Sequence, residues 1–204
     1  MAKQVNPCKV ITGPGVRASY LNWHEPRLND QTDKKEYSVQ GLVAKTDQYT
    51  IDRLKAAIKE AIRKKYKDNP PSGLRLPLRD GDEEDEVTGG FVREGEEYRG
   101  HYYFSATSTD QPGVVDANRV RLEEASSFVS GDFCRISCTA SVYDFKDDNG
   151  ARVLGVKFYL NNLMMTKRGE PLSASRVAAE EEDWGDMDDS DVQGSTDAID
   201  SLLS

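Results

Sequence analysis

Basic and aromatic residues alternate in two neighbouring segments of the chain, in a pattern that could bind an unpaired nucleic-acid strand. Arg135 and Tyr143 lie an even number of residues apart in the first segment, as do Lys157 and Tyr159 in the second. Nucleobases stack on aromatic rings with about 1–3 kcal/mol each, and cationic side chains follow the phosphates. The pattern therefore predicts binding to single strands with little sequence preference. The alternative is that the tyrosines only cover a half-exposed sheet face, since tyrosine favours strands.

Further residues of these two kinds occur earlier in the chain. The segment GVRASYLNWHEP, residues 15–26, contains Arg17, Tyr20 and Trp23. A tryptophan such as Trp23 is more often a core residue than a stacking platform. Tyr102 and its neighbour Tyr103 must face opposite sides of a strand, so at most one of them can stack on a base. We expect the arginines and the lysine to contact phosphates and the aromatic rings to stack. The predicted DNA-binding residues are Arg17, Trp23, Tyr103, Arg135, Tyr143, Arg152, Lys157 and Tyr159.

Residues able to catalyse a reaction are scarce. The sequence has no Walker A motif, no G-x-S-x-G and no H-E-x-x-H. His24 and His101 are isolated, which favours structural or surface roles. Cys134 and Cys138 have no histidine nearby, so a zinc site is not expected. We therefore predict a protein that is not an enzyme and has no cofactor.

An acidic stretch at residues 80–85 is the one candidate for a cation site. Its sequence, DGDEED, lacks the glycine at the sixth loop position and the later glutamate of an EF-hand. The whole segment 80–98 is polar and Gly-rich, which predicts a solvated, mobile loop. A metal-dependent nuclease that uses these acids is the least favoured of the alternatives.

The acidic residues are distributed unevenly along the chain. The 204 residues include 36 acidic and 27 basic ones, for a net charge of −9. Ten of the acids lie in residues 180–204, where there is no lysine or arginine, so the rest of the chain carries 26 acidic and 27 basic residues. Nine more acids lie between residues 80 and 97, which leaves the remaining surface basic. A nucleic-acid partner is therefore compatible with the overall negative charge.

The C-terminal segment ends in a short apolar stretch, residues 199–204, that follows most of its acidic residues. A flexible polyanion tethered beside a basic groove competes for the phosphate sites, and an apolar tip can dock on a partner protein. A purely solubilising tail is the simpler interpretation. A different class of function, an adaptor whose tail binds a basic partner while the body never contacts nucleic acid, is the main alternative to DNA binding. The predicted partner-binding residues are Asp197, Ile199, Asp200, Leu202 and Leu203.

Apolar residues recur at spacings of three and four over residues 47–66, which predicts one amphipathic helix. Thr46 or Asp47 can cap its start, and the sequence Asp-Asn-Pro-Pro at residues 68–71 ends it. The apolar stripe must lie against strands. Its members are Ile51, Leu54, Ile58, Ile62 and Tyr66.

Two long alternating runs predict a hairpin of half-buried strands. They are joined by residues 147–150, whose Asn-Gly pair favours a tight turn. Further strands are expected within residues 9–23, with a break at Gly13-Pro14-Gly15, and at residues 37–44 and 100–107. The residues expected to point inward from the hairpin are Cys134, Ile136, Cys138, Ala140, Val142, Leu154, Val156, Phe158 and Leu160.

About five strands with one helix between them favour a small barrel, because a barrel removes unpaired edges. The predicted fold is mainly β, an OB-fold-like antiparallel β-barrel with one inserted amphipathic helix. It would occupy residues 1–178 as a single-stranded DNA-binding domain, followed by a disordered acidic tail at residues 179–204. No run approaches the roughly 18 apolar residues of a membrane helix, and three cysteines give no disulfide framework. We expect a cytoplasmic protein, in the host cell if it is phage-encoded, and the sequence leaves homo-oligomers open.

Several short motifs occur in an order that resembles a known family over residues 8–176. That family comprises the OB-fold single-stranded DNA-binding proteins of phages and prophages, formerly classed as a domain of unknown function. The motifs are GVRASY at residues 15–20 with Glu25-Pro26, YSV at 37–39 leading to Lys45, LPLRDGD at 76–82, GHYYFSA at 100–106, PGVVD at 112–116, Ser130-Gly131 ahead of Arg135, LNN at 160–162 and GEPL at 169–172.

The resemblance implies binding of single-stranded DNA, with little sequence preference, in phage DNA replication, recombination or repair. It also implies that there is no catalysis. The acidic tail is similar in design to those of bacterial and T7-type phage single-strand binders, although this chain ends in Leu202-Leu203-Ser204 and not in phenylalanine. Replication or recombination proteins would then be the partners of the tail.

Overall fold

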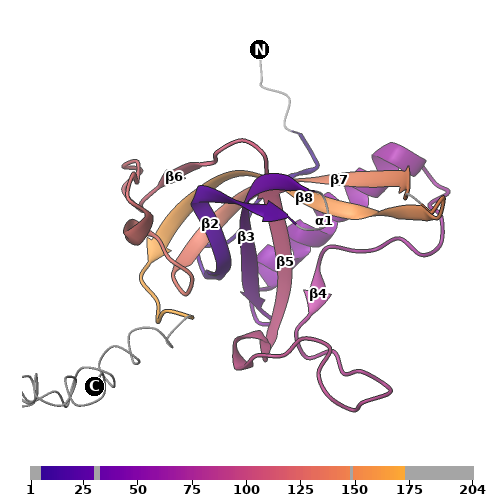
Figure 1. Cartoon of the computed structure of the whole chain (residues 1–204), viewed down its shortest axis with the longest axis horizontal. Helices are drawn as coiled ribbons and strands as arrows, with labels where there is room; N and C mark the ends of the chain where they lie inside the picture. Colours follow the sequence, from indigo (N-terminus) through magenta and orange to yellow (C-terminus); the bar gives the residue numbers. More distant parts are fainter. Residues whose placement is uncertain (1–5, 30–32, 148, 173–204) are drawn as a thin grey trace, which may run out of the picture. The chain divides into compact units, whose positions relative to one another are not determined.

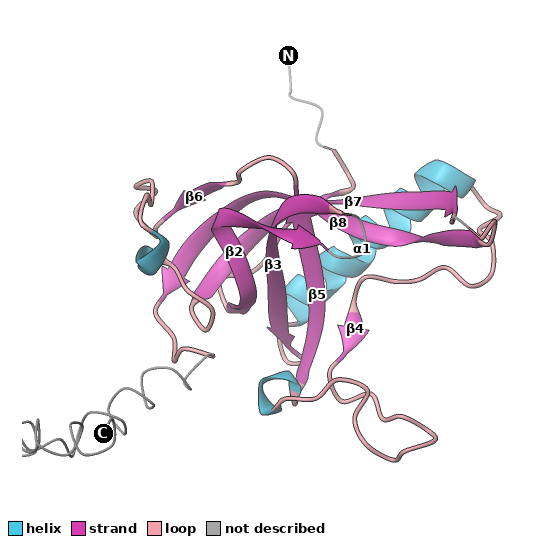
Figure 2. Ribbon diagram, in the orientation of Figure 1, coloured by secondary structure: helices cyan, strands magenta, loops and turns pink. Residues whose placement is uncertain are grey.

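The computed structural model describes residues 6–29, 33–147 and 149–172. Within them the chain forms eight strands and one α-helix (Figures 1 and 2), as expected for a mainly β fold with one helix. The elements are β1 (Lys9–Ile11), β2 (Val16–Asn29), β3 (Lys34–Ala44), α1 (Gln48–Tyr66), β4 (Arg79–Asp80), the 3-10 turn η1 (Glu96–Tyr98), β5 (His101–Ser108), β6 (Gly113–Val115), the 3-10 turn η2 (Ala125–Ser127), β7 (Phe133–Lys146) and β8 (Arg152–Lys167).

The strand pairings form a closed ring. β7 pairs with β2, β2 with β3, β3 with β5 and β5 with β8, and β8 pairs again with β7. The sheet is mixed and not wholly antiparallel, because β8 runs parallel to β5 and to β6. β7 and β8 are consecutive in the chain and pair in antiparallel directions. The break expected at Gly13-Pro14-Gly15 separates β1 from β2, and the strands that were not expected are β4 and β6, which have only two or three residues each.

Helix α1 begins and ends as the sequence predicts. Asp47 caps its start: the backbone N–H of Thr50 donates to Asp47 Oδ1 at 3.0 Å, and the Thr50 hydroxyl donates to Asp47 Oδ2 at 2.6 Å. This satisfies a donor that the first helical turn would leave unpaired. Ile51, Leu54 and Ile58 are buried in the core. The amphipathic stripe thus fixes the helix against β7 and β1.

The predicted hairpin is confirmed and continues past the ring. The inward residues of β7, from Cys134 to Ala140, are buried at alternate positions, and Val156, Phe158 and Leu160 of β8 are buried as well. The pairing runs on to Lys146 opposite Arg152. We call this outer part, residues 141–146 and 152–157, the β7–β8 arm; it projects beside α1 in Figure 2.

The polar segment at residues 80–98 is a loop, as expected, but both of its ends are fixed to the sheet. Lys45 Nζ lies 2.6 Å from Asp80 and 2.8 Å from Asp82, and these two carboxylates raise the pKa of Lys45 to about 12. At the other end Tyr98 is buried and donates its hydroxyl hydrogen to Gln40 Oε1 at 2.6 Å. The first acids of the loop are therefore paired with the lysine that directly follows β3.

The acidic C-terminal tail and its predicted partner-binding residues, Asp197, Ile199, Asp200, Leu202 and Leu203, lie outside the described residues. The boundary predicted at residues 178 and 179 lies there too, so both stay predictions. No helix in the described part of the chain is long and apolar enough to cross a membrane.

A close approach between two loops holds β2, β7 and β8 together. Asp132 is fully buried, pairs with Arg168 at 2.9 Å and accepts the backbone N–H groups of Val129 and Gly169. Beside it Gly131 has a φ of +111°, and a Cβ atom there would lie 2.1 Å from the carbonyl oxygen of Glu170. Only glycine fits this position without displacing the backbone.

We expect Gly131→Ala to lower the free energy of unfolding by about 2 kcal/mol or more, because it combines an unfavourable φ with a backbone clash. Gly15→Ala is the matched control: a Cβ atom there meets no atom within 4 Å, and its effect should stay within about 0.5 kcal/mol. Urea denaturation followed by circular dichroism measures both. Equal midpoints for the two variants would contradict the prediction.

Candidate nucleic-acid interface

Polar and aromatic side chains share one face across four strands of the ring. Tyr159 of β8 lies opposite Thr107 of β5 and Thr139 of β7, and Thr107 lies opposite Ser38 of β3. Residues paired in this way point to the same side of a sheet. No member of this set is a carboxylate. We define this outer face as Ser38, Gln40, Ser105, Thr107, Thr139, Ser141, Tyr143, Lys157 and Tyr159.

Lys157 and Tyr159 form the most accessible cation–aromatic pair of this face. The Tyr159 side chain is 44% exposed, and Lys157 Nζ lies 4.3 Å from the centroid of its ring. Within the described residues Lys157 has no carboxylate in ion-pair distance. The ammonium group is therefore available to an anion, and the ring next to it to a base.

Tyr143 lies on the same face at the base of the β7–β8 arm. It is opposite Gly155, and a Cβ atom at that glycine would lie 2.5 Å from the Tyr143 hydroxyl oxygen. The tyrosine side chain thus crosses the neighbouring strand where no side chain blocks it. Phe145 is 55% exposed, and its ring centroid lies 6.1 Å from that of Tyr143. Phe145 was not among the predicted site residues, although its spacing of two from Tyr143 could have indicated it.

Arg152, one of the predicted DNA-binding residues, does not lie on the outer face. It is an even number of residues from the inward-facing Leu154 and so faces the helix side of the arm. Its guanidinium group donates to both carboxylate oxygens of Asp144, at 2.9 and 2.8 Å. Asp144 also accepts the hydroxyl hydrogen of Tyr66 of α1 at 2.9 Å. Arg152 thus joins the two strands of the arm and holds Asp144, which binds Tyr66 of the helix.

Trp23 and Tyr103 are packed inside the protein and offer no open ring face for stacking. Trp23 is 4% exposed, and its Nε1–H donates to the carbonyl oxygen of Phe128 at 2.8 Å. Tyr103 is 7% exposed and lies against Tyr98, with ring centroids 5.2 Å apart. The structure thus places both rings in the core, where they give no support to the expectation that they stack on bases.

Arg17 and Arg135 are half-buried and bound to backbone carbonyl groups. Arg17 donates to the carbonyl oxygens of Gly131, at 3.1 Å, and Glu170, at 2.7 Å. Arg135 donates to that of Thr12 at 3.0 Å. Both keep a positive charge without a carboxylate partner among the described residues, but neither lies beside Lys157 and Tyr159. They position loops at other parts of the ring.

A cluster that the sequence analysis missed surrounds Arg93. Its guanidinium group lies 4.8, 5.5 and 6.0 Å from the ring centroids of Tyr98, Tyr20 and Tyr103. Tyr20 is 59% exposed and has a φ of +44°, at an irregularity in the pairing of β2 with β3. A bulge with an unfavourable backbone conformation that presents an exposed ring is typical of a functional position. No local pattern indicated this cluster because Arg93 is 73 residues from Tyr20.

The described residues were also compared with the requirements of a metal site and of a reactive thiol. They contain no group of three or more histidine, cysteine, aspartate or glutamate side chains placed to hold a metal ion. Cys134 and Cys138 are buried, and burial raises the pKa of both thiols. They are core residues, and a raised pKa disfavours the thiolate form that reacts or binds metal.

The outer face therefore has the parts that unpaired nucleic acid requires. Exposed tyrosine rings can stack on bases, an unpaired lysine can meet a phosphate, and serine and threonine hydroxyls can donate hydrogen bonds. A closed β ring with such a face defines the class of small β proteins that are suited to a single nucleic-acid strand.

The comparisons with known proteins identify a family within this class. Residues 8–193 match the family described as Enterobacter phage Enc34, ssDNA-binding protein, and the chain belongs to this family. No curated protein matches the chain. The family is described by DNA binding and not by catalysis.

Solved structures of phage proteins have a similar fold. The single-stranded DNA-binding protein of bacteriophage Enc34 has 19% identity and a TM-score of 0.63, over 89% of this chain and 96% of that one. A structure of that protein in complex with ssDNA has 19% identity and a TM-score of 0.61, over 84% and 97%. The single-stranded DNA-binding protein gp2.5 of bacteriophage T7 has 16% identity and a TM-score of 0.51, over 85% and 93%.

The contact between the arm and the helix predicts a stability change at acid pH. Arg152 and then Tyr66 hold the pKa of Asp144 at about 2, below its ordinary 3.8. A carboxylate with a lowered pKa stabilises the fold above about pH 4, and this contribution is lost as the pH falls toward 2. We expect Asp144→Asn to lower the melting temperature at pH 6, with a difference from the parent that narrows by pH 2.5. The difference in melting temperature between Arg152→Gln and the parent should narrow in the same way. A difference that stays constant from pH 6 to pH 2.5 would contradict the ion pair between Arg152 and Asp144 as its cause.

Proposed function

We propose that this protein binds single-stranded DNA with little sequence preference and acts in phage DNA replication, recombination or repair. The observation that carries the proposal is the pair of Lys157 and the exposed Tyr159 on the outer face of a closed strand ring, in a chain of a single-strand-binding family. We interpret the ring, with α1 packed against it, as an OB-fold-like barrel. The Enc34 protein, whose fold is similar, has been solved in complex with ssDNA, which supports this interpretation.

Binding would depend on stacking and charge. One base stacks on Tyr159 while Lys157 neutralises a neighbouring phosphate, and hydroxyl groups such as that of Thr107 donate to phosphate oxygens. Tyr143 and Phe145 extend the aromatic surface along the β7–β8 arm. Every base has a π face, so such a surface accepts any sequence.

A second set of contacts would lie at the Arg93 cluster. Tyr20 offers an exposed ring there, with the cation of Arg93 beside it. Arg17 and Arg135 contribute positive potential from their loop positions. Trp23 and Tyr103 support the surface from within, and Arg152 keeps the arm in place.

The double variant Tyr143→Ala, Tyr159→Ala tests the assignment of the surface. Each lost stack removes about 1–3 kcal/mol, so we expect at least tenfold weaker binding of a labelled oligodeoxynucleotide by fluorescence anisotropy. Tyr49→Ala is the matched control because Tyr49 is a 57% exposed tyrosine on α1, and its affinity should stay within twofold of the parent. An affinity of the double variant within twofold would remove both tyrosines from the site.

The same titrations separate the classes of function. The parent should bind single-stranded DNA more tightly than duplex DNA, with RNA as a third probe. An adaptor that never contacts nucleic acid would bind none of the three. That result would overturn the proposed function.

We further propose that the acidic tail competes with DNA for the basic surface and that its apolar tip recruits replication or recombination proteins. The support is the charge pattern: ten acids without a single base in residues 180–204, followed by Leu202 and Leu203. A tethered polyanion is present at a high effective concentration.

Deleting residues 180–204 should tighten DNA binding, and most strongly at low ionic strength, where charges are least screened. Anisotropy titrations between about 20 and 300 mM salt measure this effect. A full-length variant with its ten tail acids changed to the corresponding amides keeps the tail length and should bind as the deletion does. Equal affinities of parent and deletion at low salt would show that the tail does not compete.

A further inference from the structure

A hollow of about 430 Å³ lies at the edge of β7, where the outer face meets the last turn of α1. Thr139, Ser141 and Tyr159 line it from the outer face, and Lys64 and Lys65 line it from the helix. Its volume is within the range for small-ligand sites, about 300–1,000 Å³. The hollow therefore brings hydroxyl groups, an aromatic ring and two cations to one place.

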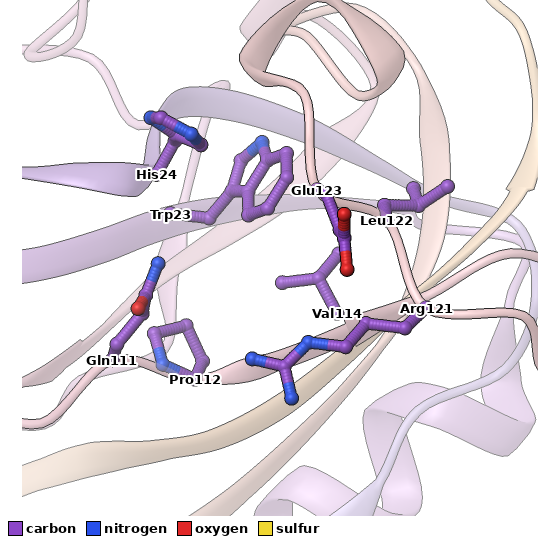
Figure 3. A pocket seen from close by; sticks show the side chains of 8 residues that line it. All are labelled: Trp23, His24, Gln111, Pro112, Val114, Arg121, Leu122 and Glu123. Carbon is purple, nitrogen blue, oxygen red and sulfur yellow. The ribbon is translucent and has the colours of Figure 1, made fainter.

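Tyr159 gives the hollow an open ring. Its side chain is 44% exposed, so it belongs both to the outer face and to the wall of the hollow. The cavity beside β6 in Figure 3 differs in this respect, because Trp23, Pro112 and Val114, which line it, are buried, and no residue of the outer face is among those labelled there. A base stacked on Tyr159 would thus lie beside the hollow at β7.

Lys64 and Lys65 are exposed cations without a carboxylate partner among the described residues. Two acidic groups close to them are already occupied. Glu60, one turn before Lys64, and Asp144 of β7 are each bound to an arginine, at 2.9 and 2.8 Å. The carbonyl end of a helix itself disfavours an anion, so any attraction of a phosphate to this end of α1 must come from the two lysine side chains.

The row of paired residues through Tyr159 ends in a third lysine at the same edge. Thr139 lies opposite Tyr159 on one side and opposite Lys9 of β1 on the other. Paired residues point to the same side of a sheet, so the exposed side chain of Lys9 lies on the same side as the outer face. In the described part of the chain Lys9 forms no ion pair with a carboxylate. Positive charge therefore gathers at this edge of β7.

The backbone of β7 is accessible along the hollow. The Ala140 N–H donates to the carbonyl oxygen of Cys8 at 2.9 Å, and the pairs of β1 with β7 run from Ile11 to Lys9. Backbone groups of an antiparallel strand alternate between its two neighbours. The N–H of Val142, which lines the hollow, therefore points to the same side as that of Ala140, beyond the last pair with β1. This edge adds a backbone donor to the hydroxyl groups of the hollow.

We propose that a single DNA strand bound at Tyr159 continues over the edge of β7 into this hollow. The phosphates of its next nucleotides bind Lys9, Lys64 and Lys65, and they accept hydrogen bonds from the hydroxyl and backbone N–H groups of the edge. The proposal rests on the proposed function and gives the path of the strand beyond Tyr159. A strand that left Tyr159 only along the β7–β8 arm, past Tyr143, would not reach these lysines.

The double variant Lys64→Gln, Lys65→Gln tests the contribution of the helix. Binding of a labelled oligodeoxythymidine should weaken at least fivefold at low salt. The slope of log K against log salt should fall by about 1.4, because each phosphate contact with a single strand contributes about 0.7. Lys55→Gln, Lys59→Gln is the matched control: it removes the same charge from exposed positions of the same helix that do not line the hollow. Equal losses in both variants would attribute the effect to net charge and overturn the path.

Acetylation of lysines by N-hydroxysuccinimide acetate, read by mass spectrometry, tests the same path in the unaltered full-length chain. Saturating single-stranded DNA should slow the modification of Lys64 and Lys65 at least threefold and leave that of Lys55 and Lys59 unchanged. Equal protection of both pairs, or protection of neither, overturns the path.

Lys157 separates this proposal from the proposed function, because it lies on the outer face and does not line the hollow. If DNA protects Lys157 from acetylation but not Lys64 and Lys65, the path over the edge of β7 is overturned and the outer face remains. If the parent binds no single-stranded DNA and none of these lysines is protected, the proposed function fails as well.

Discussion

The contact between β5 and β8 is the one on which the rest of the structure depends. It has only two parallel pairs, Ala106 with Phe158 and Thr107 with Tyr159, yet it closes the ring of strands. Behind it the rings of Phe104 and Phe158 pack edge to face at 5.3 Å between centroids. Gly41 leaves the room for this packing, because a Cβ atom there would lie 2.8 Å from Phe104 and 2.9 Å from Ile136. Core packing and closure therefore stabilise each other.

Closure also creates the outer face. The pairing of β8 with β5 places Tyr159 and Lys157 in rows with residues of β3, β5 and β7. Without this pairing they would be residues of an isolated hairpin. Strand alternation sends the large apolar side chains inward, and the other side keeps hydroxyl groups and partly open rings. The binding surface is thus the second face of the strands that make the core. A change that loosens the core should therefore disturb the surface too.

The sequence was sufficient to predict those parts of the structure that depend on residues close together in the chain. The spacing of Ile51, Leu54 and Ile58 predicted α1, and the alternation from Cys134 to Ala140 predicted the inward face of β7. It was insufficient where the partner is distant. Trp23 is buried by Phe128, more than 100 residues away, and three tyrosines from different segments gather at Arg93. Alternation tells which residues share a face, but it does not tell which face another segment covers.

The placement of ion pairs explains how a chain with a net charge of −9 can present an anion-binding face. In the described domain Asp80 and Asp82 are paired with Lys45, Asp132 with Arg168, and Asp144 with Arg152. None of these carboxylates is on the outer face, and each is held close to a cation, with Asp80 and Asp82 sharing Lys45. An ion pair has little net potential beyond its immediate surroundings, especially with salt screening. Lys157 has no such partner there, so its positive charge acts on the outer face even though acidic residues outnumber basic ones in the whole chain.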